Sequence, residues 1–205
     1  MRYMIALIAA VLLAAGCGGE ADTEQDSAAP STAAPKAAAT PAGPQTRQVA
    51  WGQPAEVLGT NLEKMRVTPI GVLYHKGPYK GVDGPENGWF VAIAVKAEAL
   101  TSAETVAGGA GGGGFHWRGN SQTMSPGDGN AVATPWVGEV NEFGVDTLIE
   151  PGSPEVGIVT FDVLAKGGRL LYLSPADNSI TSWDLPMADQ GTGLDKVRER
   201  IKLFS

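Results

Sequence analysis

The sequence predicts an all-β protein, a two-sheet antiparallel sandwich that ends in a short helix. Three observations lead to this fold class. Between Trp51 and Met187 the chain consists of short runs rich in Val, Ile, Trp and Phe, separated by clusters of Gly, Pro, Asn and Asp. Helical periodicity is nearly absent from this segment, so no crossover helices are expected that could join parallel strands. The number and spacing of the runs are typical of a sandwich.

The first three predicted strands cover residues 55–59, 65–75 and 89–100. Pro69 lies inside the second strand, and because proline cannot donate a ladder hydrogen bond, it indicates an edge position or a bulge. Asn87-Gly88 before the third strand fits a tight turn. The third strand gives the strongest signal, since alternate apolar residues place one face toward the core: Trp89, Val91, Ile93, Val95 and Ala97.

Four further strands are predicted at residues 115–119, 156–164, 169–174 and 179–185. The first of them follows a glycine tract, which we interpret as a loop. Pro151-Gly152 predicts a turn before the second, whose core face is expected to carry Val159, Phe161 and Val163. The last two strands are separated by Pro175, Asp177 and Asn178, a pattern that predicts a hairpin.

The C-terminal tail, residues 188–205, carries the helical signal. Thr192 and Asp195 are spaced as a capping pair, and apolar residues recur near one face, namely Leu194, Val197, Ile201 and Phe204. The other face is mainly basic. Two alternatives remain open: the helix packs on the sandwich, or it docks on a partner or an anionic membrane.

The N-terminus resembles a bacterial lipoprotein signal. Arg2 precedes an apolar run that is too short to span a bilayer permanently, and small residues lead directly to Cys17, the chain's single cysteine. The resemblance implies that residues 1–16 are removed and that Cys17 carries the lipid, including palmitate-type acyl chains. It also implies attachment to the extracytoplasmic face of the cell membrane.

Residues 17–48 are expected to form a disordered tether. From Gly18 this stretch is rich in Ala, Pro, Ser and Thr and holds no aromatic or large aliphatic residue, so it cannot bury enough apolar surface to offset its chain entropy. The sandwich itself is then predicted to span residues 49–187.

The chain also resembles the telokin-like, immunoglobulin-like domains of actinobacterial and other Gram-positive lipoproteins, a group that includes a secreted mycobacterial antigen. The resemblance rests on the strand 89–100, the Leu-x-x-Pro-Gly step at 148–152, the Gly-x-Val-x-Phe-Asp-Val segment at 157–163 and the final Trp183-Asp184-Leu185. It implies an immunoglobulin-like sandwich, and it implies no activity or catalytic residues.

Composition narrows the function classes. The net charge of −7 repels nucleic acid, and we therefore expect no nucleic-acid partner. Because Cys17 is the only thiol, no intramolecular disulfide can form. The glycine tract lacks the Gly-Lys-Ser/Thr ending of a phosphate-binding loop, and no other cofactor motif is present.

Catalytic signals are weak, and the chain is predicted not to be an enzyme. The two histidines, His75 and His116, lie in no metal-binding motif, and no serine lies in a Gly-x-Ser-x-Gly sequence. Ser121, His116 and Asp128 could be combined into a catalytic set, but spacing alone makes such trios common in any sequence. The alternative that remains is an envelope metal-binding protein or hydrolase that uses His75 or His116.

The segment from the glycine tract to residue 144 holds the candidate binding residues His116, Trp117, Arg118 and Trp136. These residue types are enriched at recognition hot spots, and the end loops of a sandwich commonly present them. The alternative, which the need of any sandwich for large core aromatics favours, is that Trp117 and Phe115 face the core. The sequence thus predicts a lipid-anchored, non-enzymatic binding module that needs no cofactor and meets a protein partner in the cell envelope.

Overall fold

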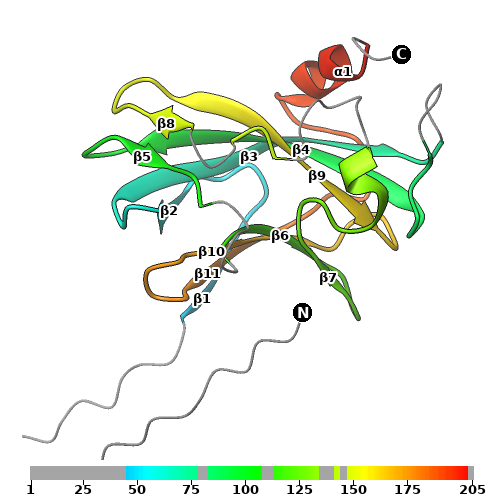
Figure 1. The fold of residues 1–205 in the computed structure, drawn as a ribbon, viewed down its shortest axis with the longest axis horizontal. Helices are drawn as coiled ribbons and strands as arrows, with labels where there is room; N and C mark the ends of the chain where they lie inside the picture. The colour runs from blue at the N-terminus through cyan, green and yellow to red at the C-terminus, as the bar shows by residue number, and fades with distance from the viewer. Residues whose placement is uncertain (1–44, 78–82, 108–112, 134–140, 144–146, 203–205) are drawn as a thin grey trace, which may run out of the picture. The chain divides into compact units, whose positions relative to one another are not determined.

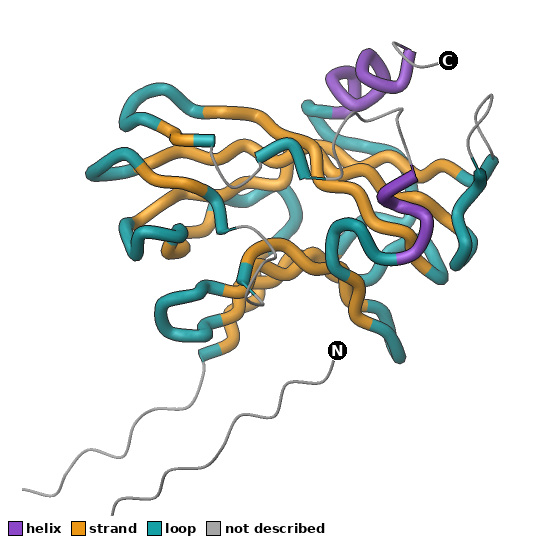
Figure 2. Tube along the Cα trace, viewed as in Figure 1, coloured by secondary structure: helices purple, strands orange, loops and turns teal. Residues whose placement is uncertain are grey.

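The computed structural model describes residues 45–77, 83–107, 113–133, 141–143 and 147–202. Within these ranges the chain forms two main β-sheets that pack face to face, with a helix outside one of them (Figures 1 and 2). The predicted all-β sandwich with a short C-terminal helix is confirmed. Residues 1–44, including Cys17 and most of the predicted tether, lie outside the described ranges.

The first sheet, as described, has the strand order β1-β11-β10-β6-β7. Its neighbours pair antiparallel except β1 and β11, which are parallel. The strands are β1 (Thr46–Val49), β11 (Ile180–Asp184), β10 (Arg169–Leu173), β6 (Gly114–Arg118) and β7 (Thr123–Met124).

The second sheet has the order β2-β3-β4-β9 and is antiparallel throughout. It is built from β2 (Ala55–Leu58), β3 (Lys64–His75), β4 (Trp89–Ala99) and β9 (Glu155–Val163). A small pair, β5 (Glu104–Thr105) with β8 (Leu148–Ile149), a 3-10 helix η1 (Gly129–Ala133) and the helix α1 (Leu194–Lys202) complete the described elements.

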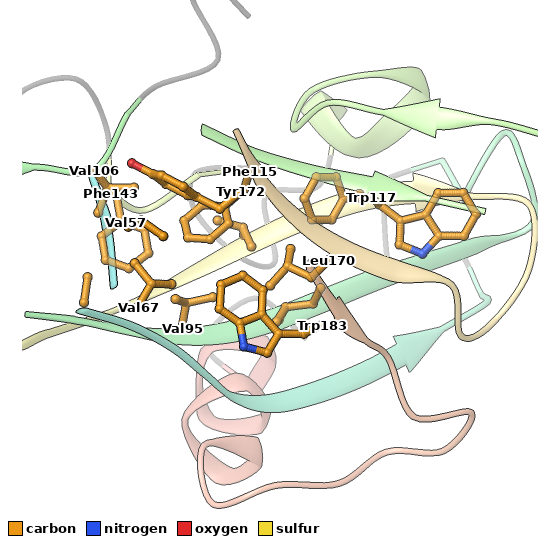
Figure 3. Close-up of a cluster of buried hydrophobic side chains, with 14 of the residues drawn as sticks. Val57, Val67, Val95, Val106, Phe115, Trp117, Phe143, Leu170, Tyr172 and Trp183 are labelled. Atoms are coloured by element: carbon orange, nitrogen blue, oxygen red, sulfur yellow. The ribbon is translucent and has the colours of Figure 1, made fainter. Parts of the chain in front are cut away.

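The hydrophobic core lies between the two sheets. Alternate residues of β4 and β9 enter it, including Val91, Ile93 and Phe161, as their alternation predicts. Figure 3 shows large aromatic side chains that the first sheet supplies to this core, namely Phe115, Trp117, Tyr172 and Trp183; the second sheet adds Tyr74 and Phe161. Because these rings fill the space between the sheets, the core closes without a disulfide.

Pro69 marks a bulge. The β3–β4 register shifts between Pro69 and Gly71. Of the two predictions for this proline, an edge position or a bulge, the bulge is confirmed. Beyond the bulge, β3 contacts the C-terminal segment: Val72 and Gln190 form an isolated bridge, and the Gly193 amide donates to the Ile70 carbonyl.

The C-terminal helix packs on the outer face of the second sheet. Its Leu194 and Val197 join a second apolar cluster with Leu73, Phe90, Ala92, Ala94 and Ile158. The Lys196 ammonium donates to the Val156 carbonyl, and Arg200 forms an ion pair with Glu142 at 2.7 Å. Packing on the sandwich is thus the alternative that the structure supports, and residues 188–202 belong to the domain rather than to a separate tail.

The sandwich begins at Thr46, so the predicted tether boundary at residue 48 is corrected. Residues 46–49 form the edge strand β1, in register with β11 from Ile180 to Trp183. The first three of its residues are exposed and the fourth is half-buried. A short, polar edge strand has almost no apolar alternation, and for that reason the sequence resembled a continuation of the tether.

Candidate binding surface

The predicted binding residues separate once the fold is known. His116, Trp117 and Arg118 follow one another in β6, and successive residues of a strand point to opposite faces. Trp117 therefore enters the core, while His116 and Arg118 lie on the outer face of the first sheet. Trp136 lies outside the described residues.

Trp117 is a core residue, exposed by only 2 %. Its indole Nε1 donates a hydrogen bond to the Gly167 carbonyl at 2.8 Å, which satisfies the buried polar atom. A Cβ at Gly119 would lie 2.4 Å from the ring, and a Cβ at Gly168 would lie 2.9 Å from Nε1. These two glycines let the backbone close over the indole, so Trp117 fixes the position of the loops around it.

Arg118 is exposed and lies directly opposite Arg169 of β10. Arg169 donates to Asp184 at 2.9 Å, and Asp184 also accepts a hydrogen bond from the Gln48 amide. Within the part of the chain that the structure describes, Arg118 has neither an ion pair nor a side-chain hydrogen bond. Among these residues, one of two neighbouring guanidinium groups is thus left without a partner.

The two arginines line a surface hollow of about 490 Å³ together with Gly119, Asn120, Gly168 and Asp184. We call it the arginine hollow. It lies where the β6–β7 turn meets the β9–β10 loop. The carboxylate of Asp184 offsets only one of its two positive charges.

A second hollow, of about 250 Å³, adjoins the first. We call it the indole hollow, because an edge of Trp117 lines it together with residues of the turn 119–122 and of the loop 164–168. The two hollows share Gly119, Asn120 and Gly168. Gln122 lines the indole hollow, and its Oε1 is buried without a hydrogen-bond partner among the described residues, so it can accept a donor from a bound molecule once the side chain turns toward the hollow.

Lys166 anchors the β9–β10 loop beside these hollows. Its ammonium lies 4.3 Å from the ring centroid of Trp89 and 5.2 Å from that of Tyr74, distances at which a cation is attracted to an aromatic ring. The Tyr74 hydroxyl donates to the Pro186 carbonyl at 2.7 Å and accepts from the Gly167 amide at 2.9 Å. Burial raises the pKa of Tyr74 to about 12, so this hydroxyl stays protonated at neutral pH.

A buried carboxylate organises the neighbouring loops. Asp162 of β9 is fully buried and accepts backbone hydrogen bonds from Glu86 at 2.7 Å, Asn87 at 2.9 Å and Asn130 at 2.9 Å. Asn130 in turn donates from its side chain to the Gly84 carbonyl. Asp162 thus joins the segment before β4 to η1, a structural role rather than a catalytic one.

The histidines lie in different sheets. His75 ends β3 in the second sheet, where burial lowers its pKa, and His116 belongs to β6 in the first sheet. They are not on adjacent strands, which a shared metal ion would have required. No group of three or more His, Cys, Asp or Glu side chains suited to a metal occurs among the residues that the structure describes.

His116 contacts a serine, although not the one that the sequence suggested. Its Nδ1 lies 3.2 Å from Ser125 Oγ, and the Ser125 amide donates to Asp128 at 2.6 Å. Ser121 instead lines the indole hollow. Ser125 and His116 are therefore in contact beside β7. The carboxylate of Asp128 accepts from the Ser125 backbone amide.

A third hollow, of about 370 Å³, lies at the other end of β11, where the chain enters the sandwich. Its Arg47 donates to the Glu56 carbonyl at 2.7 Å. Hydrogen bonds from the backbone and side chain of Ser179 lower the pKa of Asp177, also in this hollow. Because Arg47 already bonds to the backbone, this hollow is a weaker candidate than the arginine hollow.

Sequence reasoning missed Arg169, Lys166 and Gln122. The sequence Lys166-Gly167-Gly168-Arg169 could have indicated these residues, because it places two basic residues around a pair of glycines where a predicted strand begins. Both glycines have φ of +79°, which favours glycine. The pairing of Arg169 with Arg118 depends on the β6–β10 register, and no local pattern encodes it.

Comparison with protein-family models, curated proteins and solved structures finds no match for this chain. The resemblance to telokin-like lipoprotein domains therefore stays a prediction. Each helix within the described ranges is too short or too polar to cross a bilayer.

Proposed function

We propose that this chain is a lipid-anchored, extracytoplasmic binding module without catalytic activity, and that it binds its partner with the arginine hollow and the indole hollow. The observation that carries the proposal is the unpartnered guanidinium of Arg118 beside Arg169 in an open hollow. Charged groups without an internal partner at the end loops of a rigid sandwich are typical of recognition sites.

The position of the hollows supports this role. The chain enters β1 at Thr46, where the Ile180 amide donates to the Gln45 carbonyl at 2.8 Å. From Ile180, β11 runs to Asp184 at the opposite end, beside the arginine hollow; Figure 1 shows β7 on the side away from the start of β1. If Cys17 is the anchor, the binding surface lies at the end of the domain opposite the point where the chain enters, accessible to a partner in the envelope.

A site-specific photocrosslinking experiment in intact cells tests the proposal. A photoreactive residue replaces Asn120 at the hollows or, as the matched control, Asp177 at the end where the chain enters. We expect a discrete adduct from position 120 only. Equal adducts from both positions, or none from position 120, would contradict the proposed surface.

The anchor requires its own test. Cells grown with an alkyne fatty acid should label the wild-type chain, and Cys17→Ser should abolish the label and release the protein from the membrane fraction. Labelling that persists in Cys17→Ser would overturn the lipid-anchor part of the proposal without affecting the binding surface.

The contact between Ser125 and His116 supports a second candidate function, a serine hydrolase of the envelope. A nucleophilic serine needs a histidine within hydrogen-bond reach as its base, and 3.2 Å meets this requirement. A fluorophosphonate probe should then label the wild type and fail to label Ser125→Ala, with Ser121→Ala as the matched control. An unlabelled wild-type chain excludes this candidate.

A further inference from the structure

We propose that the joined hollows bind an acidic sugar, whose carboxylate or phosphate lies between Arg118 and Arg169 and one of whose hydroxyls donates to Gln122 Oε1. This inference rests on the proposed function and specifies the ligand class of the same surface. Three features carry it: an electrostatic imbalance, an unpaired acceptor and a fixed frame of loops.

The electrostatic imbalance is intrinsic to the β6–β10 pair. Like charges directly opposite each other on antiparallel strands are destabilising, and Arg118 and Arg169 are such a pair. Asp184 compensates Arg169, and no described residue pairs with Arg118. An oxyanion with two or more oxygens can accept from both guanidinium groups and turn the repulsion into two charge-assisted hydrogen bonds.

The unpaired acceptor identifies the neutral part of the ligand. Gln122 lines the indole hollow, and its Oε1 is buried with no partner among the described residues; an unsatisfied buried acceptor is unfavourable, which favours a rotation that brings it to a bound hydroxyl. Because the two hollows share three residues of their lining, a molecule with its anion in the arginine hollow reaches the indole hollow directly. A hydroxyl carried a few bonds from an acidic group, as in a sugar acid or a sugar phosphate, meets both requirements.

The loops around the hollows are held in place before the ligand binds, so the site is preorganised. A Cβ at Gly168 would lie 2.7 Å from the Arg118 carbonyl oxygen, so the β9–β10 loop is in close contact with β6. Lys166, stacked between Trp89 and Tyr74, holds the same loop from the other side. A preorganised site loses little entropy when its ligand binds.

A saccharide fits better than an acidic peptide. Peptides commonly bind by adding a strand to a bare sheet edge, whereas β6 and β10 both lie inside the first sheet with a neighbour on each side. The hollows therefore offer side chains rather than free backbone groups. Asn120, Ser121 and Gln122 add polar groups that suit hydroxyls.

Calorimetric titration of the full chain in detergent micelles tests the inference. The probes are glucuronate, glucose 1-phosphate, glucose, inorganic phosphate, an oligomer of galacturonate and an acidic peptide. We expect the two acidic sugars to bind and glucose not to bind. Tighter binding of the oligomer than of glucuronate points to a polymer as the source, and equal binding points to the free sugar.

Variants locate the site. Arg118→Gln should weaken glucuronate binding by about tenfold, as expected for a lost charged hydrogen bond, whereas Arg198→Gln on α1, the matched control, should not change it. Arg118→Glu should abolish binding while its melting temperature without ligand stays at or above that of the wild type, because it replaces a like-charge pair with an ion pair. That variant separates loss of binding from loss of folding.

Gln122→Leu distinguishes the contribution of the sugar hydroxyl to binding from that of the anionic group. It should weaken glucuronate binding and leave binding of inorganic phosphate unchanged. Equal affinities for phosphate and glucuronate with no effect of Gln122→Leu would overturn the saccharide assignment, and so would preference for the acidic peptide. If no acidic sugar binds while crosslinking at position 120 still gives an adduct, this inference fails and the proposed function stands.

Discussion

Adjacent residues of one strand have opposite roles in this molecule. The sequence run His116-Trp117-Arg118 has the composition of a recognition segment, yet the alternation of β6 places Trp117 in the core and Arg118 at the surface. Composition therefore selected this segment as a candidate, and alternation decided which of its residues are accessible. The consequence for Trp117 is practical: its replacement would test folding rather than binding.

At the scale of single residues, Tyr74→Phe tests the anchoring of the β9–β10 loop. The variant removes the acceptor of the Gly167 amide and the donor to the Pro186 carbonyl, and we expect it to lower the free energy of unfolding by about 1–3 kcal/mol. Chemical denaturation measures this loss, and hydrogen exchange should show faster exchange at Gly167. Tyr172→Phe, whose hydroxyl bonds to Ala107 and Leu58 instead, is the control that should leave Gly167 protected.

The stability difference between the wild type and Tyr74→Phe should depend on pH. Burial raises the folded-state pKa of Tyr74 from 10.0 to about 12, so the fold favours the neutral phenol. The contribution of the neutral Tyr74 phenol to the free energy of unfolding is fully present below pH 10 and is lost as the pH rises toward 12. The stability difference between wild type and Tyr74→Phe should therefore narrow across this window; a difference independent of pH would contradict the assigned environment.

At the scale of elements, the sequence predicted those strands that are long enough to show a pattern. Each of the seven predicted runs corresponds to a strand, and the core faces of β4 and β9 are as expected. The strands it missed are β1, β5, β7 and β8, of two to four residues each, too short for alternation to be recognised. The hollows could not be predicted for a related reason, because they depend on register between β6 and β10, about 50 residues apart in the chain.

Gly71→Ala tests the contact between β3 and the start of α1. A Cβ at this position would lie 2.6 Å from the Gly193 carbonyl carbon and 2.7 Å from the Leu194 nitrogen, backbone atoms that cannot move independently of the helix. We expect a loss of roughly 2 kcal/mol in the free energy of unfolding, as for overpacked sites. Amides of α1 should lose more protection from hydrogen exchange than those of β4.

Gly77→Ala provides the comparison for this variant, because the nearest atom to its added Cβ is 3.8 Å away, an ordinary contact. It should have a melting temperature close to that of the wild type. If Gly71→Ala retained full protection of α1, the close packing of the helix on the second sheet would be contradicted.

At the scale of the whole molecule, the proposed binding surface is separated from the point where the chain enters the sandwich. The chain enters at the Gln45–Ile180 end of the first sheet, and the arginine hollow lies at the Asp184 end. The second sheet carries α1 on its outer face, so the helix serves the fold. The first strand of the domain, β1, begins directly after the expected tether, and its Gln48 donates to Asp184 at the hollow.

The position of β1 leads to a prediction about where the domain starts. A chain that begins at residue 49 lacks the parallel ladder to β11, the bond from Arg47 to Glu56 and the bond from Gln48 to Asp184. Compared with a chain that begins at residue 41, its melting temperature should fall by roughly 5–10 °C, the shift that a loss of a few kcal/mol gives at this size. The exposed edge of β11 should also promote self-association, which size-exclusion chromatography detects. Equal melting temperatures and monomeric elution of both chains would restore the original boundary at residue 49 and reduce β1 to the last part of the tether.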